Sequence, residues 1–319
     1  MKRRDAFFGL GLLGTAAASG RAWAQPALRR VGVLSVGNTP SDMPRMLAEL
    51  GRVDGRDITV DMRSAQGRTE TLPALAAELA ALRPAVVISL GPQATTAVLA
   101  ADPAVPVVAL LGSAVEAGLV PQLARPGGRL TGVSFLGSTL NGKRLELLAE
   151  LLPKGASVMN LGDASLRTAS FLTDELAQVS RSLGMATHNV PAATPAEIDT
   201  AFATAARLRV IGVNVLASPF LHAQRGRIFA LAAKARLPAI YQWPQSAREG
   251  GLVAYGPDLP AMNRLLAEMA VQVLNGTRAG DIPMVQPTRF ELVINQATAR
   301  TLGLTLPRTL LLRADEVIG

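Results

Sequence analysis

The 319-residue chain has no cysteine, two histidines and only 4% aromatic residues. The lack of cysteine excludes disulfides, thiol nucleophiles and cysteine-based metal sites. His188 and His222 are far apart and fit no metal-binding spacing such as HExxH, so we expect no zinc site and place both on the surface or a helix face. The chain also lacks a G-x-G-x-x-G loop and catalytic carboxylates at a recognisable spacing, which argues against an enzyme and against a cofactor.

The basic residues behind the net charge of +8 are not gathered in one segment of the chain. Residues 1–24 carry +3 of it, which leaves +5 for arginines scattered over the remainder. A nucleic-acid surface needs a basic stripe, often with stacking rings, and neither is present. We therefore expect no nucleic-acid partner.

The first 24 residues have the three parts of an export signal. Lys2-Arg3-Arg4 is positive, residues 7–18 are apolar but too short for a confident membrane span, and Ala22-Trp23-Ala24 fits a small-x-small cleavage site. The arginine pair before Phe7-Phe8 suits a twin-arginine signal and a Sec signal equally. We predict cleavage after Ala24 and a periplasmic mature chain that is not inserted in the membrane, where ATP and most nucleotide cofactors are absent.

The rest of the chain predicts an α/β fold. Residues 85–98 set the pattern, because the apolar run Ala85–Ile88 suits a strand buried on both faces, and Gly91-Pro92 then leads into a helix. Strands and amphipathic helices alternate in this way through two consecutive units, which indicates parallel sheets with helices on both faces. Among the helices, the spacing predicts Leu166–Leu183, Pro195–Arg207 and a single helix over Leu221–Ala235.

Ligands of open α/β sheets bind beyond the carboxyl ends of the strands, so the strand-to-helix corners are candidate binding sites. The first unit supplies Ser35, Asn38, Gly91, Gln93, Ala94, Thr95, Ser113 and Glu116, and the second supplies Asp163, Ser165, Ser218 and the stretch 241–243. Serine, asparagine and aspartate also cap helices and form turns, so each residue is a candidate for either role. The corner Gln93–Thr95 is the preferred site, because the free N–H groups of a first helical turn could hold a carboxylate.

The aromatic residues add one compositional signal. Tyr241, Trp243 and Tyr255 are the only tyrosines and tryptophan after residue 24. They suit a core near a chain crossing and an aromatic wall against a planar ligand equally.

Several stretches together resemble the ABC transporter substrate-binding protein family that includes tryptophan-binding members. They are 118–120 (GLV), 123–128 (LARPGG), 130–132 (LTG), 142–148 (GKRLELL), 237–241 (LPAIY), 250–252 (GGL), 255–256 (YG), 286–288 (QPT), 290–295 (FELVIN) and 314–318 (ADEVI). The resemblance covers residues 28–319 and implies a type I periplasmic-binding-protein fold, with two Rossmann-like lobes and a ligand cleft between them.

The resemblance also implies the lobe boundaries and the partners. Chain crossings near 135, 255 and 284 give an N-terminal lobe of 28–135 plus 256–283 and a C-terminal lobe of 136–255 plus 284–319. Asp258, just past a crossing, becomes a further ligand-binding candidate. The implied function is capture of a small molecule by lobe closure and delivery to the membrane permease of an ABC importer, by a monomer.

The ligand is less clearly indicated. An amino acid or an aromatic carboxylate fits the family, the helix N-terminus and the aromatic cluster. However, relatives often have Asp-Pro before the Gly-Leu-Val motif, where this chain has Ser113-Ala114 with Glu116 two residues further on. Two other functions stay open: presentation of a ligand to a sensor kinase or chemoreceptor, and an exported two-lobe enzyme such as a glycosyltransferase or epimerase.

Overall fold

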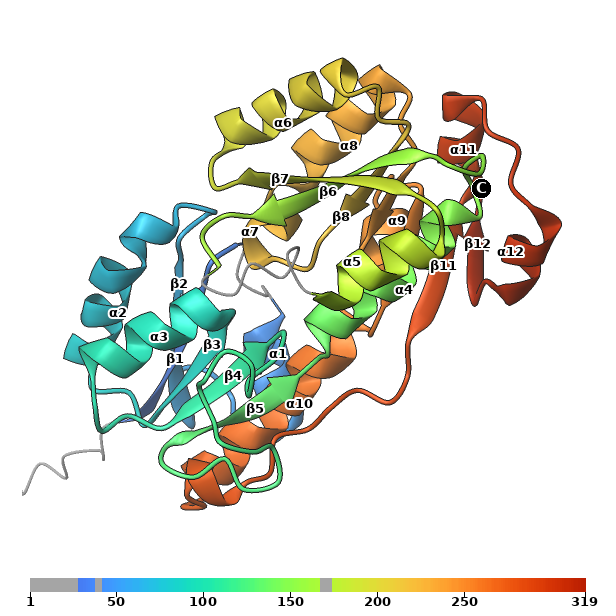
Figure 1. Cartoon of the computed structure of the whole chain (residues 1–319). Helices are drawn as coiled ribbons and strands as arrows, with labels where there is room; N and C mark the ends of the chain where they lie inside the picture. The colour runs from blue at the N-terminus through green and yellow to red at the C-terminus, as the bar shows by residue number, and fades with distance from the viewer. Residues whose placement is uncertain (1–27, 38–41, 167–173) are drawn as a thin grey trace, which may run out of the picture.

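The described residues of the computed structural model, 28–37, 42–166 and 174–319, form two β-sheets with helices on both faces of each (Figure 1). The first sheet has five strands in the order β2-β1-β3-β4-β5, and every neighbouring pair is parallel. Its strands are β1 (Arg29–Ser35), β2 (Ile58–Ser64), β3 (Val86–Leu90), β4 (Val107–Leu111) and β5 (Leu130–Ser134). This is a doubly wound order, in which the sequence order of the strands reverses between β1 and β3 although all strands stay parallel.

The apolar runs of the central strands are buried on both faces of the sheet. In β3, Val86 and Ile88 pack with α1 and α10 on one face, whereas Val87 packs with α2 and α3 on the other. The helices and short 3-10 turns of this lobe are α1 (Met43–Glu49), η1 (Thr69–Thr71), α2 (Leu72–Ala81), α3 (Pro92–Ala101), α10 (Leu259–Leu274) and η3 (Ala279–Asp281). Because α10 comes from much later in the chain than the strands it covers, the lobe is assembled from two separate segments.

The second sheet has seven strands in the order β12-β11-β10-β9-β8-β6-β7. Its strands are β6 (Ser157–Asp163), β7 (Ala186–Ala192), β8 (Gly212–Val215), β9 (Ala239–Tyr241), β10 (Val253–Gly256), β11 (Glu291–Asn295) and β12 (Glu316–Ile318). Neighbouring strands are parallel except for the antiparallel pair β10–β11. The part from β7 to β10 repeats the order of the first sheet, with its reversal between β6 and β8.

The faces of this sheet are covered by two separate groups of helices. One group packs with Leu145 and Leu148 of α4, and the other packs with Ile198 of α6 and Ile228 of α8. The helices are α4 (Gly137–Ala149), α5 (Asp174–Ser182), α11 (Gln296–Leu302) and α12 (Arg308–Arg313) on one face, and α6 (Pro195–Arg207), α7 (Pro219–Ala223), α8 (Arg225–Ala235) and α9 (Pro244–Arg248) on the other. The predicted α/β class and the helix Pro195–Arg207 are thereby confirmed.

Two helix predictions need comment. The predicted single helix Leu221–Ala235 is wrong, because α7 ends at Ala223 and α8 begins at Arg225 with Gln224 in a turn between them. The predicted helix Leu166–Leu183 overlaps residues 167–173, which lie outside the described residues; its described part is α5.

The described part of the chain passes between the two sheets in three places. It goes from β5 to α4, from β10 to α10, and from Val285, which still pairs with Val133 of β5, to β11. Val285 N donates to Gly132 O at 2.9 Å and Ser134 N donates to Val285 O at 2.9 Å. We keep 28–135 plus 256–283 and 136–255 plus 284–319 as the proposed lobes, but Val285 still pairs with the first sheet, so the third crossing follows Val285 rather than residue 283.

A buried arginine organises the second crossing. Arg144 of α4 is fully buried; its Nε donates to Tyr255 O at 2.8 Å and its Nη1 to Asn141 Oδ1 at 2.8 Å. Burial lowers the pKa of Arg144 to about 9, so the side chain stays protonated at neutral pH. Beside it, a Cβ added to Gly256 would lie 1.9 Å from Gln242 O, so only glycine permits this close approach of the crossing to the corner after β9.

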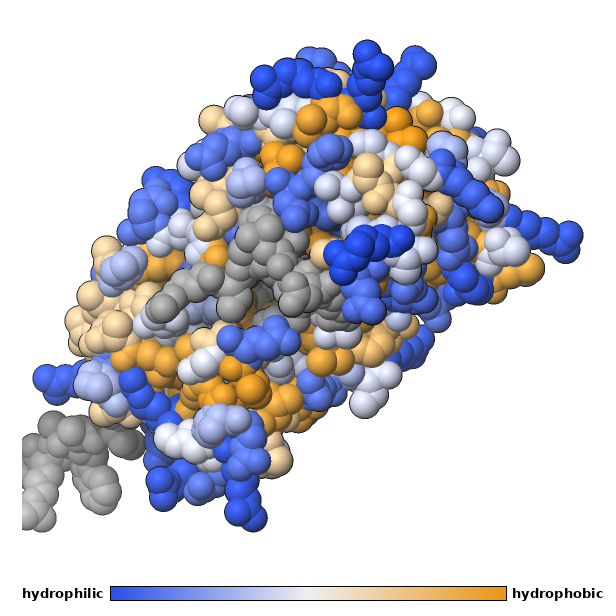
Figure 2. Space-filling model, in the orientation of Figure 1, coloured by the Kyte–Doolittle hydropathy of each residue, from blue (hydrophilic) through white to orange (hydrophobic). Residues whose placement is uncertain are grey.

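The face drawn in Figure 2 has no single hydrophilic stripe, because its most hydrophilic residues are scattered over both lobes. Within the described residues, no helix combines the length and the apolar character needed to cross a bilayer.

Candidate functional site

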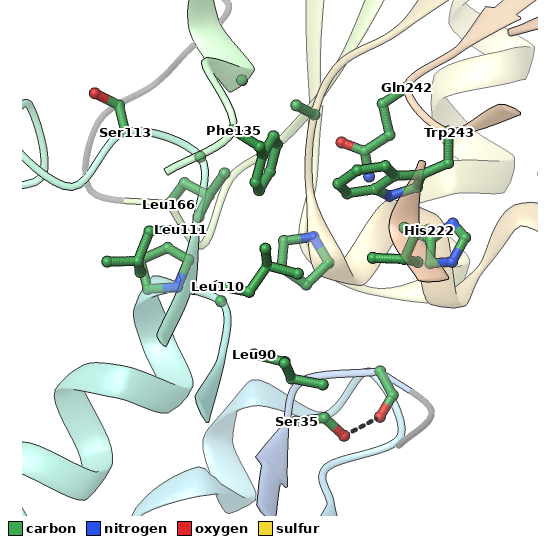
Figure 3. Close-up of a pocket in the computed structure, with 18 of the residues that line it drawn as sticks. Ser35, Leu90, Leu110, Leu111, Ser113, Phe135, Leu166, His222, Gln242 and Trp243 are labelled. Carbon is green, nitrogen blue, oxygen red and sulfur yellow. Dashed lines mark hydrogen bonds between the residues drawn. The ribbon is translucent and has the colours of Figure 1, made fainter. Parts of the chain in front are cut away.

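A cavity of about 220 Å³ lies between the two sheets, at the carboxyl ends of their central strands (Figure 3). It is lined by Ser35, Gly37, Leu90, Gly91, Pro92, Leu110, Leu111, Gly112, Ser113, Glu116, Ala117, Phe135, Gly137, Leu166, Ala217, Pro219, His222, Ala223, Arg225, Gln242, Trp243, Leu259 and Asn263. Ser35 ends β1 and Leu90 ends β3, so the first sheet meets the cavity at its reversal of strand order.

Aromatic and aliphatic side chains form most of the wall. The rings of Phe135 and Trp243 are 4.9 Å apart at an interplanar angle of 54°, and His222 approaches Trp243 edge-on with ring centroids 6.2 Å apart. In Figure 3, Leu90 and Leu110 lie on the other side of the cavity from Trp243. Such a wall suits the apolar body of a small molecule.

Three polar atoms in the lining have no hydrogen-bond partner among the described residues: Gln242 Oε1, Asn263 Oδ1 and His222 Nδ1. Gln242 and Asn263 are buried, at 5% and 7% exposure. Gln242 follows β9 in the second sheet, whereas Asn263 is in the first two turns of α10 on the first sheet. Buried polar groups are nearly always paired, so these atoms are candidate ligand contacts.

His222 is neutral at physiological pH. Its pKa is lowered to about 4, chiefly by desolvation and also by the nearby Arg225 cation, while the Glu249 carboxylate acts in the opposite direction. Arg225 Nε forms an ion pair with Glu249, and Arg225 Nη1 donates to His222 O at 3.1 Å. His222 lies in a helix, as one of the two predicted alternatives has it, and its ring lines the cavity from α7.

Four of the predicted ligand residues line the cavity: Ser35, Gly91, Ser113 and Glu116. Ser35 Oγ donates to Gly37 O at 2.6 Å and so holds the turn after β1. Asn38, which was predicted in the same turn, lies outside the described residues. From the predicted stretch 241–243, Gln242 and Trp243 also line the cavity.

The preferred corner, Gln93–Thr95, is not part of the lining. Thr95 is fully buried and bonds to Ser89 Oγ at 2.8 Å and Gly91 O at 2.9 Å, and Ala94 packs into the core of the lobe. Gln93 turns away and its Nε2 donates to Ser165 Oγ of the other lobe at 2.9 Å. The part of the corner that reaches the cavity is Gly91 and Pro92, and proline has no N–H to offer a ligand.

Asp163, Ser165 and Ser218 form a network on the second-lobe side of the Gln93 contact. Asp163 Oδ1 accepts from Ser165 Oγ at 2.6 Å, and Asp163 Oδ2 accepts from Ser218 Oγ at 2.6 Å. Ser218 Oγ also caps α7 by accepting from Leu221 N at 3.1 Å. None of the three lines the cavity; Ser165 makes the contact with Gln93 of the first lobe, and Asp163 links Ser165 to Ser218 within the second.

The remaining predicted residues lie elsewhere. Tyr241 packs edge-on against Phe229 with ring centroids 5.0 Å apart, and burial raises its pKa. The ring centroids of Tyr255 and Phe290 are 6.3 Å apart. Asp258 Oδ1 caps α10 by accepting from Ala261 N at 2.9 Å. Of the aromatic cluster, Trp243 alone reaches the cavity, while Tyr241 belongs to the core.

The corner rule missed Phe135, His222 and Asn263. Phe135 lies in a crossing between the lobes, and the other two lie inside helices rather than at strand ends. The polar residues Asn263 and His222 among apolar neighbours in their helices are the only hint in the sequence. Among the residues with a described structure, no group of three or more His, Asp or Glu could hold a metal ion.

Comparison with known proteins supports the same fold. A model of the family described as ABC transporter substrate binding protein matches residues 39–318. A tyrosine-binding protein of Clostridioides difficile (strain R20291) is 24% identical over 265 residues, which cover 82% of this chain and 75% of that protein.

Two solved structures are similar over nearly their whole length. The ABC domain from Streptococcus pneumonia in complex with L-Trp has a TM-score of 0.81 and 23% identity, over 92% of this chain and 100% of that one. A conserved domain protein from Vibrio cholerae O1 biovar El Tor str. N16961 has a TM-score of 0.82 and 23% identity, over 91% and 99%. The predicted periplasmic-binding-protein type of fold is confirmed. The family match also makes this a binding protein rather than an enzyme, and the chain belongs to the ABC transporter substrate binding protein family.

Proposed function

We propose that the protein captures an aromatic amino acid, or a close analogue, between its lobes and delivers it to the permease of an ABC importer. The observation that carries this proposal is the apolar cavity walled by Phe135 and Trp243 at the carboxyl ends of both sheets. The tyrosine-binding protein, which is similar in sequence, and the L-Trp complex, which is similar in fold, lend support, because both are described with an aromatic amino acid.

The arrangement of the lobes supports capture by closure. Contacts such as Gln93 with Ser165 and Gly91 with Pro219 join the two lobes around the cavity. A ligand enclosed in this way is accessible only when the lobes separate, so closure reports its presence to a partner. The export signal proposed for residues 1–24 would place this activity in the periplasm, and a monomer suffices for it.

Thermal unfolding of the exported protein against amino acids, aromatic acids, sugars and nucleosides tests the proposal. A ligand that binds the folded state alone raises the melting temperature with concentration. We expect the largest rise from tryptophan, tyrosine or phenylalanine, and a much smaller one in Trp243→Leu. Phe290→Leu, at a ring outside the cavity lining, is the matched control and should keep the response. A rise produced by sugars or nucleosides alone would contradict the proposed ligand class.

A further inference from the structure

Two of the unpartnered polar atoms of the cavity are amide oxygens, which accept hydrogen bonds, and they come from both lobes; the third is His222 Nδ1. Gln242 Oε1 belongs to the second lobe and Asn263 Oδ1 to the first, and neither has a hydrogen-bond partner within residues 28–37, 42–166 and 174–319. An acceptor buried without a partner costs the free energy of its lost hydration. A ligand that supplies donors to both atoms recovers that cost only when the lobes are together.

The orientation of the Gln242 carboxamide is fixed by its surroundings. Gln242 Nε2 donates to Ser218 O at 3.1 Å, so a flipped amide would set two carbonyl oxygens against each other. The group presented toward the cavity is therefore Oε1, an acceptor. In Figure 3 this carboxamide lies next to the Trp243 indole and faces the side on which Phe135 stands.

The aromatic surroundings favour a cation over an anion. The faces of Trp243 and Phe135, which line the cavity, attract cations. Arg225 is the lining's one Lys or Arg side chain among the described residues, and it is engaged by Glu249 and His222 O.

The backbone donors expected to hold a carboxylate are also displaced from the cavity. In α3 the first N–H groups belong to Gln93 and Ala94, and neither residue lines the cavity. Thr95 N is already bonded to Gly91 O at 3.0 Å. The anion-binding end of this helix is thus separated from the enclosed volume by Gly91 and Pro92.

We propose that the group which determines ligand selection is a protonated amine, held by Gln242 Oε1 and Asn263 Oδ1 beside the Trp243 and Phe135 rings. This inference rests on the proposed function and refines it. The amine bridges the lobes, whereas a carboxylate on the ligand adds little to affinity. Aromatic amines without a carboxylate are then ligands, and aromatic acids without an amine are poor ones.

Calorimetric titration of the exported protein with matched ligands tests this assignment. The first series is L-tryptophan, tryptamine and indole-3-propionate, and the second is L-tyrosine, tyramine and 4-hydroxyphenylpropionate. We expect each amine to bind within about tenfold of its parent amino acid, and each acid to bind more weakly by on the order of a hundredfold. Acids that bind as well as the amino acids, or amines that do not bind, overturn the assignment but leave aromatic ligand binding intact. Failure of all six compounds, with binding of a sugar or nucleoside, overturns the proposed function as well.

A variant separates the acceptor from general packing. Asn263→Leu keeps the size of the side chain and removes the acceptor, so affinity for tryptamine should fall about tenfold or more while affinity for indole-3-propionate stays the same or rises. Gln272→Leu, at an exposed glutamine of the same helix, is the matched control and should change neither. Equal losses for the amine and the acid in Asn263→Leu, at an unchanged melting temperature, would contradict the amine contact.

Discussion

At the scale of single residues, His222 couples the cavity to pH. Its pKa is about 4 in the folded chain, against 6.5 for the free side chain, so the unfolded chain binds the proton more tightly. Above pH 6.5 the histidine is neutral in both states and the unfolding free energy is unaffected. As the pH falls from 6.5 toward 4, the unfolded chain takes up a proton that the folded chain does not, so the unfolding free energy decreases. The shift corresponds to up to about 3 kcal/mol of unfolding free energy.

Urea unfolding between pH 7.5 and pH 4 measures this loss. We expect the wild type to lose more stability over this range than His222→Gln, which cannot titrate there. His188→Gln, at the histidine of β7 outside the cavity lining, serves as the control and should behave like the wild type. Identical pH profiles for the wild type and His222→Gln would show that the ring is hydrated rather than desolvated.

Individual residues also show how much of the candidate site could be predicted from the sequence. The carboxyl-end rule finds Ser35, Gly91, Ser113 and Glu116 because it depends only on where strands end, and strand ends are visible as the limits of apolar runs. It misplaces Thr95, because no sequence pattern shows that the Thr95 hydroxyl forms a buried hydrogen bond with Ser89 inside the lobe. Contacts made across the lobes, including those of Phe135 and Asn263, depend on relative placement that local patterns do not encode.

At the scale of elements, the break between α7 and α8 adapts the second lobe to the first. The signal for it in the sequence is weak: Gln224 is neither glycine nor proline, although Gly226 follows two residues later and no apolar residue occurs between Ala223 and Ile228. Ser218 caps α7, and α7 then lies against glycines of the first lobe. Gly91, at φ +104°, would bring a Cβ within 2.8 Å of Pro219 Cγ, and a Cβ on Gly37 would be 2.9 Å from Ala223 Cβ.

Gly37→Ala should therefore hinder closure without disturbing either lobe. The added methyl group meets Ala223 only when α7 is docked, so we expect an unchanged melting temperature for the ligand-free protein and about tenfold weaker ligand binding. Gly226→Ala in α8, where an added Cβ meets nothing within 4 Å, should bind like the wild type. Calorimetry on the two variants decides the matter: equal affinities would mean that α7 does not dock against Gly37 in the bound form.

At the scale of the whole molecule, both sheets contain the same five-strand order, and segments that follow their strands line a shared cavity. The repeat is visible in the sequence only as a second run of alternating strands and helices, so the fold class could be predicted while the pairing of β10 with β11 could not. That antiparallel pair joins two segments separated by α10, which belongs to the other lobe. The lobes are thus connected at three crossings and, away from these, by side-chain contacts.

The contact from Gln93 to Ser165 is the one best placed to hold the lobes closed, because Asp163, which also accepts from Ser218, fixes Ser165 on the second lobe. Gln93→Ala removes one interlobe hydrogen bond, worth about 0.5–1.5 kcal/mol, and should weaken ligand binding by roughly two- to tenfold through a smaller closed population. Small-angle scattering should show a larger radius of gyration for the ligand-free variant and the wild-type value at saturating ligand. Gln272→Ala, on the exposed side of α10, should leave both quantities unchanged. An unaltered radius and affinity in Gln93→Ala would assign lobe closure to the α7 contact and the ligand alone.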